Sequence, residues 1–360
     1  MQQETLTLVL NPGSTTTKIA IYQGLEEKVL QTIDHERAAL QRYASVYEQL
    51  DYRFTFIKEI MIKEGYAFSD FSIVMGRGGL LHPLAGGVYE ITPDMIQDLK
   101  NARYGEHPCN LGAPLALKAV SLGAGRGYIA DPVVVDELIP EARVSGLPEL
   151  PRKSIFHALN QKIAAREVCE EIGKPYDKAR LIVAHLGGGI SIGVHYKGKV
   201  IDVNNALDGD GPFSPERSGG LPAGDLVRLS LSGRFTPAEL QKLICGNGGI
   251  AAYLGTSDVR EIIEKALIGD EDSAFYLRAM LYQVSKEIGA LSTVLHGDID
   301  AIVLTGGMTK SDLIVQQIKN RVSYLAPVHV IPGEREMLSL AENAIAVRQG
   351  VREVNTYELV

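Results

Sequence analysis

The stretch LTLVLNPGSTTTKIAIY, residues 6–22, decides the fold, because its pattern returns about half a chain later as RLIVAHLGGGISIGVHY, residues 180–196. In each copy a β-branched apolar run enters a turn of Gly, Ser, Thr or Asn and leaves as an alternating strand, which predicts a hairpin. Such turns suit phosphate, because glycine lets the backbone come close and the N–H groups and hydroxyls donate hydrogen bonds to an anion. Two copies indicate two similar halves that could grip one polyphosphate between them, although two ordinary hairpins would give the same pattern.

Composition limits the class of protein. The 360 residues are enough for two domains, each with its own core. The net charge is −8 and no run of Lys or Arg occurs, which argues against a nucleic-acid partner. Cys109, Cys169 and Cys245 lie far apart without CxxC spacing, so neither a disulfide framework nor a zinc site is expected. No signal-peptide pattern precedes Leu6 and no apolar stretch is long enough for a membrane span, so we expect a cytoplasmic protein without a membrane partner.

Helix and strand patterns alternate along both halves. Short strands are predicted at 72–75, 128–131, 181–184, 200–203, 301–304 and 328–331. Helices are predicted at 43–64, 93–102, 112–122, 155–172, 222–231, 237–244, 258–268, 273–295, 311–325 and 337–347. This mixture implies an α/β protein with sheets covered by helices, in which ligands bind beyond strand ends, where the glycine-rich turns lie.

The two hairpin turns carry groups that suit an anion. The first, NPGSTTTK at 11–18, offers a carboxamide, four hydroxyls and a cation, which suits an anion with Mg²⁺ nearby; its lysine lacks P-loop spacing. In the second turn, His185 stands beside three glycines whose N–H groups could cradle phosphates, although a packed core histidine is an equal alternative. The run 189–193 also matches GxSxG, but its alternation predicts a strand, so a hydrolase serine is not expected.

Four charged residues outside the turns are further candidates. Arg77 and Arg217 each lie in a glycine-rich loop, and arginine binds carboxylate or phosphoryl groups through two parallel hydrogen bonds, although an isolated arginine is more often a surface residue. Asp131 follows a short strand, where a carboxylate can face a ligand. Glu336 stands before the last helix, where it could equally serve as an N-terminal helix charge.

The stretch LNPGSTTTK resembles the opening motif of the acetokinase family, the acetate and butyrate kinases of the acetate kinase/sugar kinase/chaperone ATPase/actin superfamily. Further motifs agree in order along nearly the whole chain: GRGGLLHPLAGGVYEI, ADPVVVDE, SIFHALNQK, HLGGGISIG, PERSGGLPAGDL, TSDVRE, LTGGMTKS and IPGERE. In combination these motifs are very specific. The shorter length and the HLGGG form are closer to butyrate kinases than to acetate kinases, which usually have Asn at the position of Gly188.

The resemblance implies a fold and an assembly. It implies two similar ribonuclease H-like, actin-like ATPase domains, each a mixed β-sheet covered by helices, with the active site in the cleft between them. The first domain would be 1–152, completed by the C-terminal helix at 340–360. The second would be 153–339 and would carry most of the nucleotide site. The family forms homodimers and sometimes larger homo-oligomers.

The resemblance implies a reaction, the ATP-dependent phosphorylation of a short-chain fatty acid with Mg²⁺. Butyrate is the expected acid, with acetate, propionate or branched acids as alternatives. A sugar kinase with Asp131 as base is a second possibility, but a neutral sugar needs no pair of arginines. A non-catalytic ATP-dependent switch is a third, and it would leave both arginine loops without a purpose.

The resemblance also implies site residues, grouped here by role. Catalysis would use Arg77, Asp131, His157, His185 and Arg217. The acid would contact Arg77, His107 and Phe156. The nucleotide would contact Asn11, Ser14, Thr16, Lys18, Gly187, Gly188, Gly189, Asp258, Val259, Arg260, Gly306, Gly307 and Met308, with adenosine in the strand-to-helix turn that begins at Gly306. The metal would be held by Asn11, Asp131 and Glu336, with Glu334 as a rival to Glu336.

Overall fold

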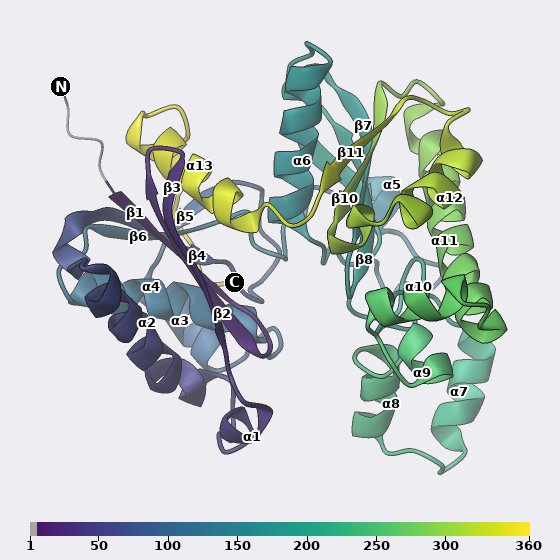
Figure 1. The fold of residues 1–360 in the computed structure, drawn as a ribbon, viewed down its shortest axis with the longest axis horizontal. Coiled ribbons are helices and arrows are strands. Elements are labelled where there is room, and N and C mark those ends of the chain that lie inside the picture. Colours follow the sequence, from purple (N-terminus) through teal and green to yellow (C-terminus); the bar gives the residue numbers. More distant parts are fainter. Residues whose placement is uncertain (1–5) are drawn as a thin grey trace. The chain divides into compact units, whose positions relative to one another are not determined.

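The structure, a computed structural model, describes residues 6–360 and divides into two compact units (Figure 1). Unit 1 ends at Val135 and resumes with Arg335–Val360, and unit 2 is Asp136–Glu334. The sequence analysis predicts boundaries at 152/153 and 339/340. The earlier change at 135/136 has a physical reason, because the backbone N–H of Ile139 donates to Ile201 and the Arg152 guanidinium pairs with Asp202 at 2.9 Å, both in unit 2.

Unit 1 is built on a seven-stranded mixed sheet with strand order β12-β5-β6-β4-β1-β2-β3. Its strands are β1 (Leu6–Pro12), β2 (Thr16–Gln23), β3 (Glu26–Asp34), β4 (Phe71–Arg77), β5 (Val88–Glu90), β6 (Arg126–Ala130) and β12 (Val354–Asn355). The predicted hairpin is the antiparallel pair β1–β2, and β4 runs parallel to both β1 and β6. The C-terminal ends of β1, β4 and β6 therefore lie at one edge of the sheet.

The helices of unit 1 are α1 (Arg37–Leu40), α2 (Leu50–Glu64), α3 (Pro93–Lys100), α4 (Gly112–Ser121) and α13 (Glu336–Arg348). All but the short α1 pack on the sheet. Alternate residues of the hairpin, such as Leu8, Leu10 and Ile19, point to one face and pack in one buried cluster with Ile57 of α2 and Leu115 of α4. Helix α13 packs on β1 and β4 (Figure 1).

Unit 2 repeats the hairpin in a five-stranded sheet of order β11-β10-β7-β8-β9. Its strands are β7 (Arg180–Leu186), β8 (Ile190–Tyr196), β9 (Lys199–Val203), β10 (Ala301–Gly306) and β11 (Val328–Pro332). The pair β7–β8 is antiparallel, and β10 runs parallel to β7 and β11. Both hairpins that the sequence repeat predicts are thus present, each with a parallel strand beside its first strand.

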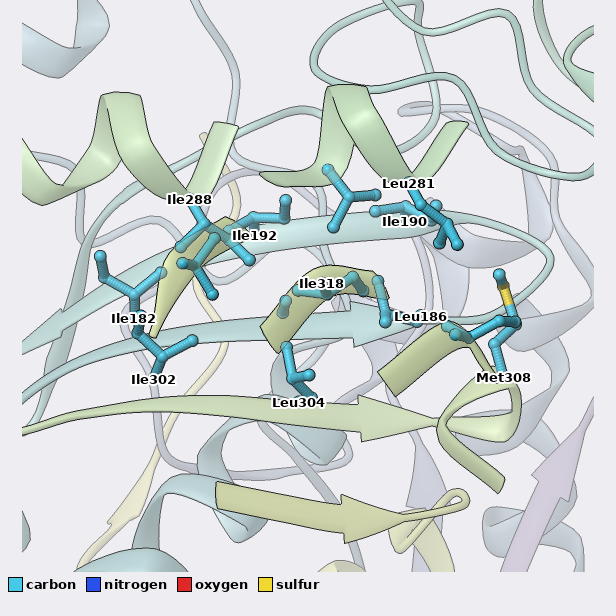
Figure 2. Packing of buried hydrophobic residues seen from close by; sticks show 14 of the residues in the cluster. Ile182, Leu186, Ile190, Ile192, Leu281, Ile288, Ile302, Leu304, Met308 and Ile318 are labelled. Carbon is cyan, nitrogen blue, oxygen red and sulfur yellow. The ribbon is translucent and has the colours of Figure 1, made fainter. Parts of the chain in front are cut away.

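The helices of unit 2 are α5 (Pro140–Arg143), α6 (Ala158–Glu171), α7 (Ala223–Leu231), α8 (Pro237–Ile244), α9 (Ile250–Leu254), α10 (Val259–Leu267), α11 (Glu271–Ser292) and α12 (Asp312–Val322). Of these, α6, α11 and α12 pack on its sheet, and α9 and α10 pack on α11. On one face Ile192 and Leu304 pack with Leu281 of α11 and Ile318 of α12 (Figure 2). On the other face Val183 belongs to a second cluster with residues of α6. Among the helices of residues 6–360, none has the length and the apolar run needed to cross a bilayer.

The C-terminal segment after α13 is anchored in unit 1 by one tyrosine. Strand β12 pairs with β5, and Tyr357 beyond it is 2% exposed. The Tyr357 hydroxyl donates to Asp98 Oδ2 at 2.7 Å, and its ring stacks on His82 with centroids 4.7 Å apart. Burial and the hydrogen bond to Asp98 both raise the pKa of Tyr357, so the hydroxyl remains a donor at neutral pH.

We expect Tyr357→Ala to lower the free energy of unfolding by ~3–5 kcal/mol, because a large buried aromatic side chain is lost. Tyr357→Phe should cost about 1–3 kcal/mol, because the buried Asp98 carboxylate loses a donor. Urea denaturation followed by circular dichroism measures both. The control is Leu359→Ala in the same segment, where the side chain is 52% exposed. A Tyr357→Ala protein as stable as this control would show that the segment is not anchored.

Candidate active site

Three predicted site residues meet at the edge where β1 and β4 end. Asn11 lies near the end of β1, Arg77 ends β4 and Glu336 begins α13. The Asn11 carboxamide donates to Glu336 Oε2 at 2.8 Å, and an Arg77 NH group lies 3.0 Å from the same oxygen. Arg77 also donates to Asn11 Oδ1 at 3.3 Å. A predicted acid-binding cation and two predicted metal ligands therefore form one cluster.

Two glycines fix the backbone of Arg77. A Cβ atom on Gly112, the first residue of α4, would lie 2.0 Å from the Arg77 carbonyl oxygen. A Cβ atom on Gly76 would lie 2.3 Å from the Gly112 carbonyl oxygen. Only glycine permits this close approach of α4 to β4, which sets the direction in which the Arg77 side chain leaves the strand.

His107 contacts the surroundings of this cluster through Cys109. Its Nδ1 lies 3.0 Å from the Cys109 thiol and accepts a hydrogen bond from the Cys109 backbone N–H. Burial raises the pKa of Cys109 to about 11, and the charges of Arg77 and Glu336 also act on it, in opposite directions. The thiol is thus protonated at neutral pH, and the role of His107 in binding the acid stays a prediction.

Asp131 follows β6 in a strained backbone conformation. It is 2% exposed and has φ +35°, a region that residues other than glycine seldom adopt. Its Oδ1 accepts from the Gly87 N–H at 2.9 Å, and its own N–H donates to the Gly87 carbonyl at 2.8 Å. Its Oδ2 lies 3.8 Å from an Arg352 nitrogen. Strain of this kind is typical of functional sites, where the surrounding contacts maintain it.

The first glycine turn joins β1 to β2. Ser14 at its tip is exposed, and Thr16 and Lys18 lie in the first residues of β2, with Lys18 opposite Asn11 in the strand register. Sequence reasoning missed Arg53 of α2, which is fully buried beneath this turn and bonds its backbone. The available signal was a charge on the apolar face of a predicted helix.

The second glycine turn, 187–189, joins β7 to β8, and the Arg217 side chain lies against it. A Cβ atom on Gly189 would fall 2.1 Å from an Arg217 NH nitrogen. Arg217 donates to the Ala206 carbonyl, its backbone N–H donates to Ser214 Oγ at 3.1 Å, and Ser214 Oγ donates to the Gly188 carbonyl at 2.6 Å. The loop that carries Arg217 is therefore bonded directly to the turn.

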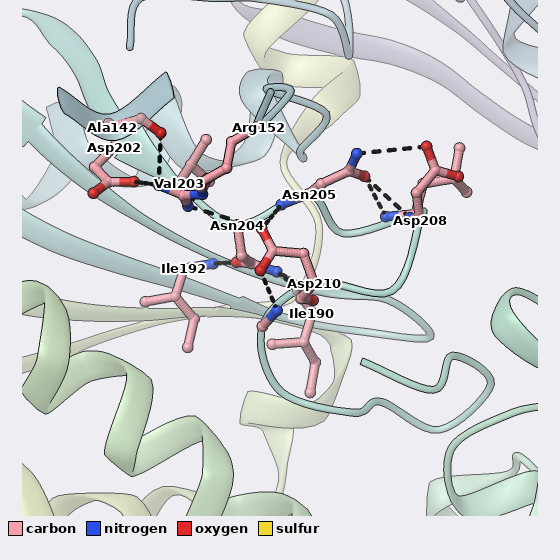
Figure 3. A network of polar contacts seen from close by, with 12 residues as sticks. Ala142, Arg152, Ile190, Ile192, Asp202, Val203, Asn204, Asn205, Asp208 and Asp210 are labelled. Carbon is pink, nitrogen blue, oxygen red and sulfur yellow. Dashed lines mark hydrogen bonds and ion pairs between the residues drawn. The ribbon is translucent and has the colours of Figure 1, made fainter. Parts of the chain in front are cut away.

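Polar contacts attach the start of this loop to the hairpin (Figure 3). The Asn204 carboxamide accepts from the Ile192 N–H at 2.7 Å and donates to the Ile190 carbonyl at 3.1 Å, in the manner of a strand partner. The Asn205 N–H donates to Asp210 Oδ2 at 3.0 Å. Because both ends of the loop are bonded, Arg217 has a defined position over Gly189.

Two predicted histidines stack in unit 2. His185, at the end of β7, is 2% exposed, and its ring centroid lies 3.9 Å from that of His157, with 12° between the ring planes. The Asn160 amide nitrogen lies 2.8 Å from His185 Nδ1 and can only donate, so the proton of neutral His185 is on Nε2. A Cβ atom on Gly187 would lie 3.0 Å from that Nε2. His185 therefore presents an N–H to the glycine turn. Phe156, beside His157, is buried.

A buried hydrogen-bonded chain extends behind His157. Its Nδ1 lies 2.9 Å from Ser191 Oγ, which accepts from the Gln161 amide at 2.8 Å. Gln161 Oε1 lies 3.0 Å from His195 Nε2, and Tyr176 follows at 2.9 Å from His195 Nδ1. Ser191 is fully buried on a strand, which confirms that the GxSxG match is no nucleophile elbow. Sequence reasoning missed Asn160 and Gln161, although both lie in the quoted SIFHALNQK motif.

A pocket of about 590 Å³ opens in unit 2. The predicted nucleotide residues in its lining are Gly187, Gly188, Asp258, Val259, Arg260, Gly307 and Met308. Lining residues that the sequence analysis did not name are Pro215, Ser257, Ile263, Lys310 and Ser311. Gly306 ends β10 just before this lining, with φ +97°. The volume is typical of small-molecule sites.

The two rival acids belong to different surroundings. Glu334 lines the pocket of unit 2, whereas Glu336 contacts Asn11 and Arg77 in unit 1. Within residues 6–360, no three His, Cys, Asp or Glu side chains gather closely enough to hold a metal ion by themselves. The carboxylate of Glu336 and the carboxamide oxygen of Asn11 are hard ligands of the kind that Mg²⁺ accepts beside phosphates and water.

Comparisons with known proteins agree over almost the whole chain. The acetokinase family profile matches residues 149–338. Butyrate kinase 2 of Clostridium acetobutylicum is 47% identical over 351 residues, which cover 98% of this chain and 99% of that protein. A probable butyrate kinase of Listeria innocua is 48% identical over 352 residues, 97% of this chain and 99% of that protein.

Solved structures share the fold. The acetate kinase of Porphyromonas gingivalis has a TM-score of 0.75 at 20% identity, over 95% of this chain and 100% of that chain. A propionate kinase from Francisella tularensis has a TM-score of 0.78 at 17% identity, over 94% and 98% of the two chains. At these identities the likeness concerns the fold alone.

The fold is the α/β fold of acetate and propionate kinases, with a mixed sheet and covering helices in each unit, as the sequence analysis predicts. The chain belongs to the acetokinase family. It is therefore an enzyme, a carboxylate kinase.

We expect the stability of unit 2 to depend on pH through His195. Burial lowers the pKa of His195 to about 3, whereas its ordinary value is 6.5. Between these values the unfolded chain binds a proton that the native protein does not bind. The free energy of unfolding therefore falls as pH falls below 6.5, by ~1.4 kcal/mol per pH unit for one such group.

Urea denaturation at several pH values between 5 and 7 measures this slope. His195→Gln keeps an amide in the chain of hydrogen bonds and has no titrating group. It should reduce the slope by ~1.4 kcal/mol per pH unit, which is the contribution of one proton. The matched control is His296→Asn, because this exposed side chain is in water in both states. Equal slopes for the wild type and His195→Gln would show that His195 does not cause the pH dependence of stability.

Proposed function

We propose that the chain transfers the γ-phosphoryl group of ATP to the carboxylate of a short-chain fatty acid, with butyrate as the preferred acid, giving an acyl phosphate and ADP. The observation that carries the choice of acid is 47–48% identity to butyrate kinases over nearly the whole chain. The geometry that supports the reaction is the Arg217 guanidinium against Gly189 and the Arg77 cluster with Asn11 and Glu336.

The acceptor determines what the protein groups must do. A carboxylate is already ionised at neutral pH, so no general base is needed to create the nucleophile. The two reacting groups are both anions, and the task is to hold them in line and to offset their charge. Arg77 orients the carboxylate in this proposal. Arg217 and the Nε2–H of His185 offset the charge on the transferring group, which is the usual role of prearranged donors.

The remaining predicted residues have supporting roles. His157 stacks on His185 and limits how that ring can turn. The pocket of unit 2 takes the adenosine between Asp258, Val259, Arg260 and the turn at Gly307 and Met308. Asn11, Asp131 and Glu336 would supply the ligands of Mg²⁺, which offsets charge on the nucleotide phosphates when bound. A homodimer or larger homo-oligomer completes the proposal, and light scattering tests it.

The first experiment is acyl phosphate formation trapped with hydroxylamine, for unbranched acids of two to six carbons and their branched isomers. We expect a maximum at butyrate, with neighbouring acids as slower substrates, because one methylene changes binding by only ~1–3 kcal/mol. A maximum at acetate, propionate or a branched acid would show that butyrate is not the preferred acid. ATP hydrolysis that no acid affects would favour a nucleotide switch and overturn the proposal.

Removal of Arg77 and removal of Arg217 should change the kinetic constants in different ways. Arg217→Ala should lower kcat by about 10²–10³-fold, because a donor to the transferring group is lost in the transition state. Arg77→Ala should also raise KM for the acid, because the carboxylate loses its orienting partner. Steady-state kinetics with both substrates varied measures the two effects. The control is Arg228→Ala in α7, a side chain that is 73% exposed. An Arg217→Ala enzyme with near-normal kcat would exclude its role.

A further inference from the structure

A buried cation lies directly beneath the first glycine turn. Arg53 of α2 is 0% exposed, although it lies in the helix that supplies Phe54 and Ile57 to the core of unit 1. Within residues 6–360, none of the groups that accept a hydrogen bond from Arg53 is a carboxylate. A buried charge without a counter-ion is costly unless its donors are satisfied by hydrogen bonds. The hydrogen bonds of Arg53 must therefore offset the cost of burying its charge.

Four of the hydrogen bonds that Arg53 makes go to one turn. One terminal nitrogen donates to the carbonyls of Gly13 and Thr16, both at 2.9 Å, and to Thr17 Oγ1 at 3.1 Å. The other donates to the Ser14 carbonyl at 3.2 Å. Gln49, one helical turn earlier, accepts from Nε at 3.1 Å and from the second terminal nitrogen at 3.0 Å. The guanidinium is thus fixed by its own helix and bonds the turn with its remaining donors.

These bonds determine which way the N–H groups of the turn point. In a trans peptide the C=O and the following N–H point in opposite directions. Because the carbonyls of Gly13 and Ser14 point at Arg53, the N–H groups of Ser14 and Thr15 point away from it. Ser14 is exposed, so the turn is open to solvent at this residue. Successive N–H groups with this orientation form an anion-binding concavity.

The charge of Arg53 contributes as well as its hydrogen bonds. Burial lowers the pKa of Arg53 to about 10, so the side chain is still a cation at neutral pH. A second residue holds the same turn without adding charge. The His35 backbone N–H donates to the Thr15 carbonyl at 2.7 Å, and its Nε2 lies 2.9 Å from Thr17 Oγ1. Burial, with the nearby Arg53 charge, lowers the pKa of His35 to about 4, so this ring is neutral.

We propose that Arg53 is a positioning residue for the nucleotide. It holds the turn 13–17 from behind, so that the N–H groups of Ser14 and Thr15 face a phosphate of ATP, and it adds a buried positive charge beneath them. This inference rests on the proposed function, since it takes ATP to be the phosphoryl donor. Arg53 itself does not contact the substrate, and its effect passes through the turn.

The test compares Arg53→Lys, Arg53→Met and Gln49→Ala with the wild type. Isothermal titration with Mg-ADP gives the nucleotide Kd, and steady-state kinetics gives KM for ATP and for the acid separately. We expect Arg53→Met to weaken nucleotide binding by about 100-fold, since the loss of hydrogen bonds from a charged group costs on the order of that factor. Arg53→Lys, which keeps the charge with fewer directed donors, should lose about 10-fold. KM for the acid should stay near the wild-type value.

Gln49→Ala is the milder variant, because it leaves the Arg53 charge in place and removes only the group that orients it. It keeps the inference testable if Arg53→Met does not fold. The matched control is Ile57→Ala, one turn further along α2 and fully buried in the same core. It should destabilise unit 1 without changing the nucleotide Kd, so a loss of binding shared by this control would assign Arg53 a structural role only.

The outcomes separate the two proposals. A wild-type enzyme that binds Mg-ADP and forms acyl phosphate, together with Arg53 variants whose Kd for Mg-ADP is unchanged, would overturn the role of Arg53 alone. A wild-type enzyme that binds Mg-ADP but phosphorylates no acid would overturn the proposed function, while weaker binding by the Arg53 variants would still support a positioned nucleotide turn.

Discussion

A turn that offers its N–H groups to an anion must point its carbonyl groups the other way, and those carbonyls need donors away from water. The two hairpin turns meet this requirement differently. Beneath the first turn, the Arg53 guanidinium donates to the carbonyls of Gly13, Ser14 and Thr16. In the second, Ser214 Oγ donates to the Gly188 carbonyl and Arg217 lies across Gly189. The cation lies behind the first turn and directly against the second. This difference agrees with the roles that we propose, nucleotide binding for the first turn and compensation of charge on the transferring group by Arg217 at the second.

The elements that the sequence predicts well are those with a strong local pattern. The buried runs of β1, β7 and β10 are nearly all apolar, and each ends in a glycine-rich turn. The sequence analysis does not predict strand β3. This strand lies at the exposed edge of the sheet, and its sequence begins with charged residues and lacks the alternation of apolar and polar residues that is typical of a half-buried strand. Helix α6 begins at Ala158, later than predicted, because His157 takes the cap position with its side chain bonded to Ser191. In such cases the position of the element in the folded protein determines where it forms or begins, and the local sequence pattern does not predict it.

The same distinction holds for the site. Residues within one contiguous motif, such as Gly187 and Gly188 or Gly307 and Met308, line one pocket of unit 2, and their role in nucleotide binding stays a prediction. The contact between Asn11 and Glu336, 325 positions apart, depends on α13 returning to the sheet of unit 1, and only the family resemblance made these residues partners in advance. Neither a contiguous motif nor the family resemblance pointed to Arg53. It belongs to no quoted motif, and its role depends on a helix docking beneath a turn that precedes it by about forty residues.

The stacked histidines agree with the chemistry that we propose for the acceptor. A carboxylate needs no base, so a histidine at this site is useful as a hydrogen-bond donor rather than as a proton acceptor. Donation requires the correct tautomer, and Asn160 determines it by donating to His185 Nδ1. The parallel stack, with ring centroids 3.9 Å apart, also limits how the His185 ring can turn. The buried Gln161 donates to Ser191 Oγ behind His157, and His195 contacts Gln161 in turn. Their contribution is to hold Ser191, and through it the ring on which His185 stacks.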